Sequence, residues 1–259
     1  MVFVRFQYIH PTRIRRQQVE IFLYKHNFIY YSIMFRTFLL KLLDLNNKKS
    51  IVAKFRKKRD IQFKQVADFL EKKVTILDVG GTEQYWKNLG YCGDLRYEIT
   101  LLNLYETESS CSNMQCVKGD GRNLTQFQDK EFDIVFSNSV LEHVGGFEDQ
   151  NRMAIEMRRV GKSYFLQTPH RFIPLEPHFV FPFFQILPEK IKLFLVQHLN
   201  LGYFNRIKNP HEAECLIRSI RLLNKRELKM LFPEAMIREE KIFGIPYSFL
   251  VFSGFHTQN

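Results

Sequence analysis

From Val74 onward, strongly apolar runs alternate with segments of helical periodicity. The apolar runs lie at residues 74–81, 98–104, 132–139 and 162–169, and Met153, Met157 and Val160 mark a helix between the last two. Strands separated by helices imply right-handed crossovers and a mostly parallel sheet. The alternation therefore predicts an α/β fold with helices on both faces of the sheet.

Polar residues close these runs, and they are expected to gather at one edge of the sheet: Asp78, Asn103, Asp120, Ser137 and Asn138. In such sheets ligands bind beyond the carboxyl ends of the strands. Gly80 and Gly81 follow the first strand, where a turn without side chains lets a ligand approach the backbone. The G-x-G-x-x-G and G-K-[ST] spacings are absent, which disfavours dinucleotides and nucleoside triphosphates. Asp78 would suit a positively charged ligand, and Asn103 could bond ribose hydroxyls.

Four segments in this order resemble one family: ILDVGG (76–81), ITLLNLYE (99–106), GDGRNL (119–124) and FDIVFSNSVLEHVG (132–145). They are similar to motifs of the class I S-adenosylmethionine-dependent methyltransferases, especially the methyltransferase type 11-like group, over about residues 76–169. The resemblance implies a Rossmann-like, seven-stranded, mostly parallel sheet and S-adenosyl-L-methionine as cofactor. By the same resemblance the cofactor residues are Asp78, Gly80, Gly81, Asn103, Asp120, Gly121, Ser137 and Asn138.

The first two motifs depart from the family pattern. Thr82 and Gln84 stand where the second and third glycines of the first motif are usual, and Asn103 replaces the acid that usually holds the ribose. Two alternatives to a methyltransferase therefore stay open. One is a non-catalytic membrane- or anion-binding module with a degenerate methyltransferase fold, and the other is a nicotinamide-dependent Rossmann enzyme.

The candidate catalytic residues are His143 and its neighbour Glu142. Methyl transfer needs a base only when the acceptor must lose a proton, and His143 is the best placed for that; a role in capping the following helix is equally compatible with the pattern. The loop after the fifth strand supplies the candidate substrate-binding residues Gln167, His170, Arg171, Glu176 and His178. Prolines at 169, 174 and 177 make this segment a stiff loop rather than a ligand-bearing helix, so we expect no metal site.

The methyltransferase domain is expected to span 74–259, with an insertion at about 171–223. Within it, residues 179–204 are rich in phenylalanine and predict either a helical lid over an apolar acceptor or ordinary core packing. Asn224 and Glu227 have the spacing of a capping box at a helix start. Residues 240–252 predict two closing strands around the turn at Gly244.

The net charge of +11 belongs to the first quarter of the chain. Residues 1–73 hold 17 Lys+Arg against 5 Asp+Glu, whereas 74–259 hold 21 against 22. We interpret 1–73 as a basic, aromatic, helical leader whose residues 1–33 are either dispensable or an interfacial membrane segment. The cluster from Lys54 to Arg59 is either a solvated helix face or a contact for an anionic partner.

The expected partner is a small-molecule substrate, with peripheral membrane contact through the leader as a second interaction. Nucleic acid is not expected, because no RNA- or DNA-binding motif accompanies the basic residues. The four cysteines lack any C-x-x-C pair and predict neither a disulfide framework nor a zinc site. These features favour a reducing compartment, so a cytoplasmic or peripheral membrane location is expected.

Overall fold

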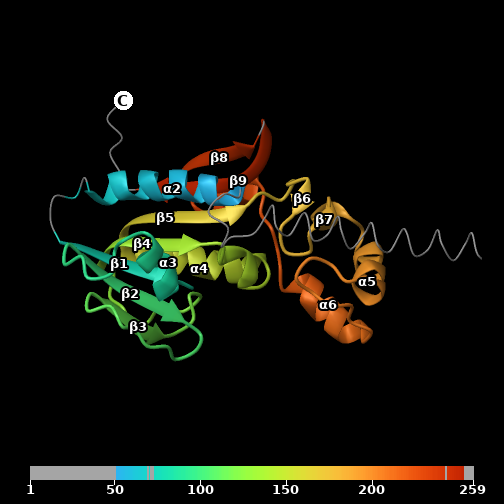
Figure 1. Ribbon diagram of the computed structural model, residues 1–259, viewed down its shortest axis with the longest axis horizontal. Helices are drawn as coiled ribbons and strands as arrows, with labels where there is room; N and C mark the ends of the chain where they lie inside the picture. The colour runs from blue at the N-terminus through green and yellow to red at the C-terminus, as the bar shows by residue number, and fades with distance from the viewer. Residues whose placement is uncertain (1–50, 69, 71–72, 243, 254–259) are drawn as a thin grey trace, which may run out of the picture. The chain divides into compact units, whose positions relative to one another are not determined.

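The computed structural model describes residues 51–68, 70, 73–242 and 244–253, and the described residues from Phe55 onward form one compact unit. Its elements follow each other in chain order (Figure 1): α2 (Ile51–Asp68), β1 (Val74–Val79), α3 (Glu83–Asn88), β2 (Tyr97–Asn103), β3 (Met114–Lys118), β4 (Phe132–Asn138), the 3-10 helix η1 (Leu141–His143), α4 (Phe147–Val160), β5 (Gly161–Pro169), β6 (Leu175–Glu176), β7 (Phe181–Pro182), the 3-10 helix η2 (Phe184–Ile186), α5 (Glu189–His198), α6 (Pro210–Arg218), α7 (Lys225–Leu231), β8 (Met236–Ile242) and β9 (Ile245–Ser253).

Seven strands form one sheet in the order β3-β2-β1-β4-β5-β9-β8. The first five run parallel, whereas β9 is antiparallel to β5 and β8 is antiparallel to β9. The predicted seven-stranded, mostly parallel sheet is thus confirmed. Strand β3 and the short β6–β7 hairpin are not predicted by the apolar pattern, because neither has a long apolar run.

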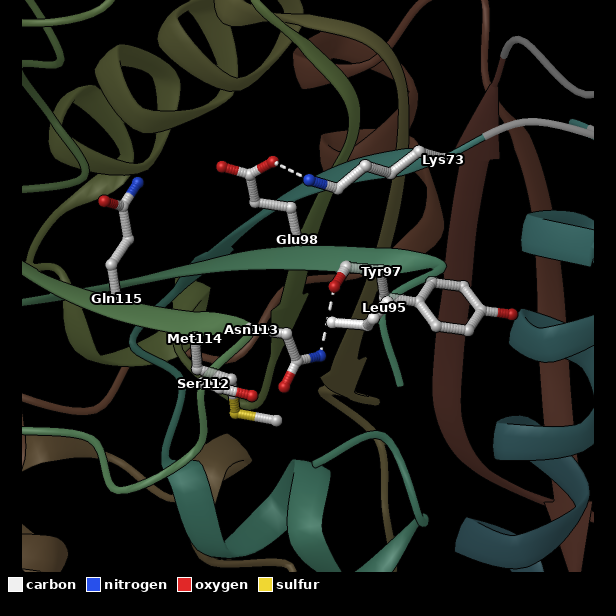
Figure 2. A pocket seen from close by; sticks show the side chains of 8 residues that line it. All are labelled: Lys73, Leu95, Tyr97, Glu98, Ser112, Asn113, Met114 and Gln115. Atoms are coloured by element: carbon white, nitrogen blue, oxygen red, sulfur yellow. Dashed lines mark hydrogen bonds and ion pairs between the residues drawn. The ribbon is translucent and has the colours of Figure 1, made fainter. Parts of the chain in front are cut away.

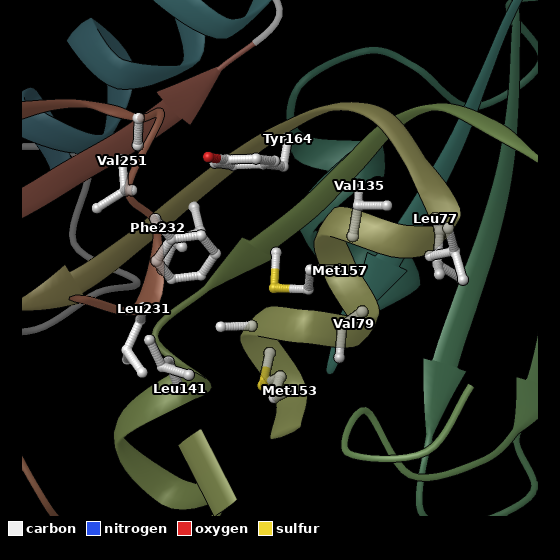
Figure 3. Close-up of a cluster of buried hydrophobic side chains, with 14 of the residues drawn as sticks. Leu77, Val79, Val135, Leu141, Met153, Met157, Tyr164, Leu231, Phe232 and Val251 are labelled. Atoms are coloured by element: carbon white, nitrogen blue, oxygen red, sulfur yellow. The ribbon is translucent and has the colours of Figure 1, made fainter. Parts of the chain in front are cut away.

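Both faces of the sheet are covered, which explains why its strands are almost continuously apolar. Along β1, Leu77 and Val79 point into a core with α4 and α7, and Ile76 points into a second core with α2 and α3. This alternation follows from the two-residue period of a strand. Figure 3 shows the first core, in which Met153 and Met157 of α4 lie over β1 and β4. The sheet edge that carries the candidate site is therefore fixed by packing on both sides.

Capping residues set the start of the helices on the first face. Asn224 accepts the backbone N–H of Glu227 at 3.0 Å, and the Glu227 carboxylate accepts that of Asn224 at 2.9 Å, so the predicted capping box is confirmed. Helix α4 begins differently, with Gly146 as its N-cap and the Asp149 carboxylate accepting the Gly146 N–H. Glu142 and His143 belong to η1 and do not cap α4.

The segment between β5 and α7 has a core of its own. Phe179 and Phe184 are fully buried there with stacked rings 3.9 Å apart, and Val196 of α5 and Ala213 of α6 pack in the same cluster. Figure 1 shows α5 and α6 side by side beyond the carboxyl end of β5. These two phenylalanines are therefore packed in the insertion's own core and not in either of the two cores against the sheet, and the lid role of the insertion stays a prediction.

The end of the expected leader packs on the sheet. Phe63 and Ala67 of α2 are buried in the second core, and residues from Phe55 onward belong to the compact unit. The division at residue 73 stays a prediction, and the interpretation of residues 1–33 lies outside the described residues. Within the part of the chain that the structure describes, no helix has the length and apolar character needed to cross a bilayer.

Cys92 and Cys111 form a disulfide, contrary to the absence of disulfides predicted from the spacing. Asn113 brings the two loops together: its side chain accepts the N–H of Gly93 at 2.7 Å and donates to the carbonyl of Tyr91 at 2.8 Å. Such a clamp depends on tertiary contacts between loops, and a cysteine count cannot reveal it.

Candidate functional site

The candidate cofactor site lies where the strand order changes direction. β1 pairs with β2 on one side and with β4 on the other, so the chain leaves the middle of the sheet in both directions at this point. Such a switch point opens a crevice beyond the carboxyl ends of the strands. Gly80, Asn103 and Asn138 all lie at these ends, as the sequence predicted.

The turn after β1 depends on its two glycines. Gly80 is exposed and has a φ of +77°, and a Cβ on it would lie 2.5 Å from Cγ2 of Val140. Gly81 is buried, and a Cβ there would lie 1.8 Å from Oδ2 of Asp78. The Asn103 side chain donates to the carbonyl of Gly81 at 2.8 Å. The neutral residue at the end of β2 therefore stabilises the turn through its amide N–H, a hydrogen-bond donor that a carboxylate lacks.

Asp78 lies beneath this turn. Its side chain is buried, and its Oδ2 accepts the indole N–H of Trp86 at 2.7 Å. Burial raises the pKa of Asp78 to about 7, and the bond from Trp86 opposes that rise. Trp86, which sequence reasoning did not single out, is thus the direct partner of the predicted cofactor acid.

Asp120 and Gly121 flank the turn from the loop after β3. The Asp120 carboxylate accepts two bonds from Arg122, at 3.0 and 2.6 Å, which hold its pKa below the usual range. A Cβ on Gly121 would lie 2.6 Å from Cγ1 of Val79 at the end of β1. The absence of a side chain at Gly121 therefore lets this loop approach the first strand.

Ser137 and Asn138 end β4 with both side chains engaged by the protein. Ser137 donates to the carbonyl of Val79 at 3.2 Å, and Asn138 accepts from Arg59 at 2.7 Å. Arg59 is only 6% exposed and also pairs with Glu240 at 2.9 Å. Neither interpretation of the basic cluster, a solvated face or an anion contact, fits Arg59, because its partners are two distant elements of the same fold.

The acid and histidine predicted as catalytic lie together with Glu176, which ends β6, and with His178 of the loop after β6. Glu142 and His143 end η1, and the ring of His143 meets that of His178 edge to face with centroids 4.8 Å apart. His178 Nδ1 lies 2.6 Å from Oε1 of Glu176. The Thr168 hydroxyl donates to Glu142 Oε2 at 3.0 Å. The fold therefore unites Glu142, His143, Glu176 and His178, which the sequence placed in two separate motifs.

Burial and neighbouring charges shift the pKa values of this group. Burial raises the pKa of Glu142 to about 7, and it lowers the pKa of His143 to about 4 although part of that ring remains exposed. Burial would also lower the pKa of His178, but the hydrogen bond and charge of Glu176 outweigh it and the pKa is raised. His143 is therefore neutral at pH 7.

The other three predicted substrate residues lie apart from one another. Gln167 accepts the Ser139 hydroxyl at 2.7 Å, and Arg171 lies 3.7 Å from Glu227. His170 stacks on Phe249 with ring centroids 4.4 Å apart, and burial lowers its pKa. His170 is thus part of the packing around β9 rather than of the histidine pair.

A basic cavity of about 440 Å³ lies next to the histidine pair. Its charged lining is Arg171, Lys192, Arg218 and Arg221, and the backbone N–H of Arg221 donates to the carbonyl of Glu142 at 2.8 Å. A second cavity, of about 220 Å³, lies at the amino ends of β1 to β3 (Figure 2). That edge is opposite to the switch point, so the second cavity does not belong to the candidate site.

Residues 77–164 match a family model described as a methyltransferase domain. No curated protein matches the chain. A solved S-adenosylmethionine-dependent methyltransferase from Aquifex aeolicus is 14% identical, with a TM-score of 0.39 over 70% of this chain and 81% of its own. One from Methanosarcina mazei is 15% identical, with a TM-score of 0.43 over 70% and 92% of the respective chains.

The 1,6-didemethyltoxoflavin-N1-methyltransferase from Burkholderia thailandensis, solved with 1,6-didemethyltoxoflavin and S-adenosylhomocysteine, is 10% identical, with a TM-score of 0.46 over 96% of this chain and 92% of its own. The family match covers about a third of the chain and runs from β1 into β5, the strands that carry the glycine turn and the Glu142-His143 pair. Residues 77–164 are thus similar to the methyltransferase domain family, within a sheet that has the Rossmann-like fold of the class I S-adenosylmethionine-dependent methyltransferases.

Proposed function

We propose that the chain transfers the methyl group of S-adenosylmethionine to a small-molecule acceptor that carries a phosphate or carboxylate group. The observation that carries this proposal is the basic cavity, whose Arg221 backbone N–H bonds the carbonyl of Glu142 in η1. A sugar or a lipid-like molecule falls within the proposed class when it bears such a group. A non-catalytic binding module and a nicotinamide-dependent enzyme are outcomes that the experiments below can reveal.

On the cofactor side, the exposed backbone of Gly80 gives a ligand access to the turn after β1. We assign Asp78, Gly81 and Asn103 to holding this turn in shape, because their contacts are with each other and with Trp86. We assign Asp120, Gly121, Ser137 and Asn138 to the same side of the proposed cofactor site. The arrangement fits a ligand that lies against backbone and small side chains at the switch point.

On the acceptor side, the lining of the cavity has four cationic side chains and no acid. Glutamates outside the lining pair with three of them: Glu227 with Arg171 and Arg221, and Glu189 and Glu214 with Arg218. Lys192 bonds a neutral group, the carbonyl of Gln185 at 2.9 Å. Burial lowers the pKa of Lys192, and the charge of Arg171 lowers it further. Among the described residues, the buried Nε2 of Gln185 has no hydrogen-bond partner. A bound phosphate or carboxylate would satisfy the Gln185 amide and stabilise both cations.

The cofactor supplies a methyl group on a positively charged sulfur, so the protein has to align donor and acceptor and exclude water. We propose that Glu142 and His143 contact the acceptor, because η1 joins the turn side of the site to the basic cavity. Arg171 and Lys192 would hold the anionic group, and Gln167, Glu176 and His178 would shape the wall between them.

Calorimetry of the full chain with S-adenosylmethionine and S-adenosylhomocysteine tests the cofactor side. Gly80→Ala should weaken binding of both at least tenfold, because the new Cβ meets Val140. Gly93→Ala is the matched control: its φ of +78° imposes the same backbone strain, but nothing lies within 4 Å of its Cβ. Absence of binding by both ligands would refute the proposal, and binding of a nicotinamide cofactor instead would favour the alternative enzyme.

The acceptor side is tested by methyl transfer from labelled S-adenosylmethionine into small-molecule extracts separated on an anion exchanger. We expect label only in the retained, anionic fraction. Lys192→Gln and Arg171→Gln should each reduce the transfer at least tenfold, whereas Lys190→Gln, an exposed cation on the same helix as Lys192, should not. Label confined to the unretained fraction would contradict an anionic acceptor.

A further inference from the structure

A buried glutamate and two histidines converge at the acceptor side of the site. One possible ligand atom from each of Glu142, His143 and His178 lies within 4.8 Å of the other two. Glu142 and His143 come from η1, and His178 comes from the loop after β6, 35 positions further along the chain. The sequence predicted no metal here because the histidines and the glutamate of the loop after β5 have an unsuitable spacing among themselves, and Glu142 and His143 lie in another motif.

Glu142 carries an oxygen without a partner in the described structure. The side chain is fully buried, and its Oε2 accepts from the Thr168 hydroxyl, but Oε1 is buried without any hydrogen bond. Leaving a polar atom buried and unpaired costs about 1–3 kcal/mol, and more when it is charged. An unpaired buried oxygen next to two imidazoles suits a positively charged ligand.

His178 is held in the form that a metal ligand requires. Glu176 is fully buried, and its Oε2 accepts the backbone N–H groups of His178 and Phe179 at 2.9 and 2.6 Å. A carboxylate so fixed accepts the proton on Nδ1 of His178, 2.6 Å away, which leaves the lone pair on Nε2. A carboxylate that orients a histidine in this way is the usual support of a metal-binding imidazole.

We propose that Glu142, His143 and His178 bind a divalent transition-metal ion, with Glu176 as the residue that positions His178. Two imidazoles and one carboxylate suit Zn²⁺, Mn²⁺ and related ions of intermediate softness. Three protein ligands leave a coordination position open, as in catalytic rather than structural sites. Ligand atoms at bonding distances of about 2.0–2.2 Å around a tetrahedral ion lie about 3.4 Å apart, so the side chains, whose ligand atoms are now up to 4.8 Å apart, need to approach one another by about 1 Å when the ion binds.

The position of the ion gives it a role in the reaction, and this part rests on the proposed function. η1 follows the segment whose Val140 lies against Gly80, and its Glu142 carbonyl bonds Arg221 of the basic cavity. An acceptor hydroxyl at the open position would lose its proton to solvent more readily. Its oxygen would then form the new bond to the methyl carbon as the carbon–sulfur bond breaks, with the electron pair remaining on sulfur.

Metal binding is tested on the full chain after dialysis against a chelator. Titration with Co²⁺, read by visible absorption, should show one site per chain, and Zn²⁺ should displace the Co²⁺. His178→Ala and Glu142→Gln should each weaken binding at least tenfold; the glutamine keeps the size of Glu142 and its contact with Thr168. Glu176→Gln should weaken binding about 10- to 100-fold through His178 alone.

The control removes an exposed pair that could bind metal on its own. Sγ of Cys215 lies 3.8 Å from Nδ1 of His211 on α6, so the His211→Ala/Cys215→Ser variant is titrated in parallel and should keep the site. Absence of stoichiometric binding of Co²⁺, Zn²⁺ and Mn²⁺, or equal binding by a His178→Ala/Glu142→Gln variant, would overturn the proposal. Calorimetry with S-adenosylhomocysteine on the same samples separates the two proposals. If the chain binds S-adenosylhomocysteine but no metal, only the metal-site proposal is refuted. If the chain binds metal but no S-adenosylhomocysteine, the proposed function is refuted.

Discussion

Arg59→Met is expected to destabilise the chain far more than a comparable change at the surface. Arg59 and Glu240 pair at 2.9 Å with side chains only 7% and 8% exposed, so the substitution leaves a carboxylate buried without its counter-ion. Breaking a buried pair of this kind costs about 3–5 kcal/mol. Lys73 and Glu98 pair at 2.8 Å but are 61% and 49% exposed (Figure 2), and Lys73→Met should cost less than about 1 kcal/mol.

Urea unfolding measures both changes, since Trp86 is the only tryptophan and is fully buried, so its fluorescence reports the loss of the core. The double variant Arg59→Met/Glu240→Leu should cost less than the sum of the two single changes by at least about 2 kcal/mol, because neither charge is then left unpaired. Equal costs at Arg59 and Lys73, or additive costs in the double variant, would refute the assignment of Arg59 as a buried tie between α2, β4 and β8. The variant should also weaken S-adenosylhomocysteine binding, since Arg59 holds Asn138.

Three further predictions concern the loops around β1 and β2. Cys111→Ser should lower the free energy of unfolding by about 3 kcal/mol under oxidising conditions, given the 19-residue separation of the pair, and should have no such effect when both proteins are reduced. The pKa of Asp78 is about 7 in the folded chain against 3.8 ordinarily, so its contribution to stability is full below pH 4 and is lost as pH rises to 7. In urea titrations Asp78→Asn should therefore gain stability relative to the parent between pH 5 and pH 8. A difference in unfolding free energy that stays constant over this range would contradict the burial of the charge. Asn103→Asp, which restores the acid usual in the family, should weaken S-adenosylhomocysteine binding about tenfold in calorimetry, because the amide that donates to the Gly81 carbonyl is lost; tighter binding would show instead that the acid is needed for the ribose.

The sheet was predictable because local pattern and global fold agree in its strands. Four of the parallel strands coincide with apolar runs to within a residue or two, and the closing pair follows from the turn at Gly244. β3 escaped the strand assignment because it lies toward the sheet's edge, where Gln115 and Lys118 remain exposed and interrupt the apolar run. The disulfide was not predicted because Asn113, a residue outside any cysteine pattern, brings the two loops that carry its cysteines together.

The gathering of polar residues at one edge of the sheet was predictable, whereas their contacts were not. Motif order placed Asp78, Asn103 and Glu142 near one edge, since the ends of parallel strands meet there. Their partners come from elsewhere: Trp86 from the next helix, the Gly81 carbonyl from the turn itself, and Thr168 from a neighbouring strand. A motif records which residue types recur, whereas the direction of a side chain depends on what packs beside it.

This difference changes how the two departures from the family pattern are understood. From the sequence alone, Asn103 in place of the usual acid predicts a weakened ribose contact, and Thr82 in place of the usual glycine predicts a weakened turn. In the folded chain Asn103 bonds the turn directly, and Thr82 is the N-cap of α3, where its side chain accepts from the backbone of Tyr85. Both substitutions thus replace a feature of the ligand site by a bond that fixes the shape of the turn. The turn is therefore held by its own side chains and by Trp86 without a ligand, and in the proposed function this would lower the entropy cost of binding S-adenosylmethionine against the backbone of Gly80.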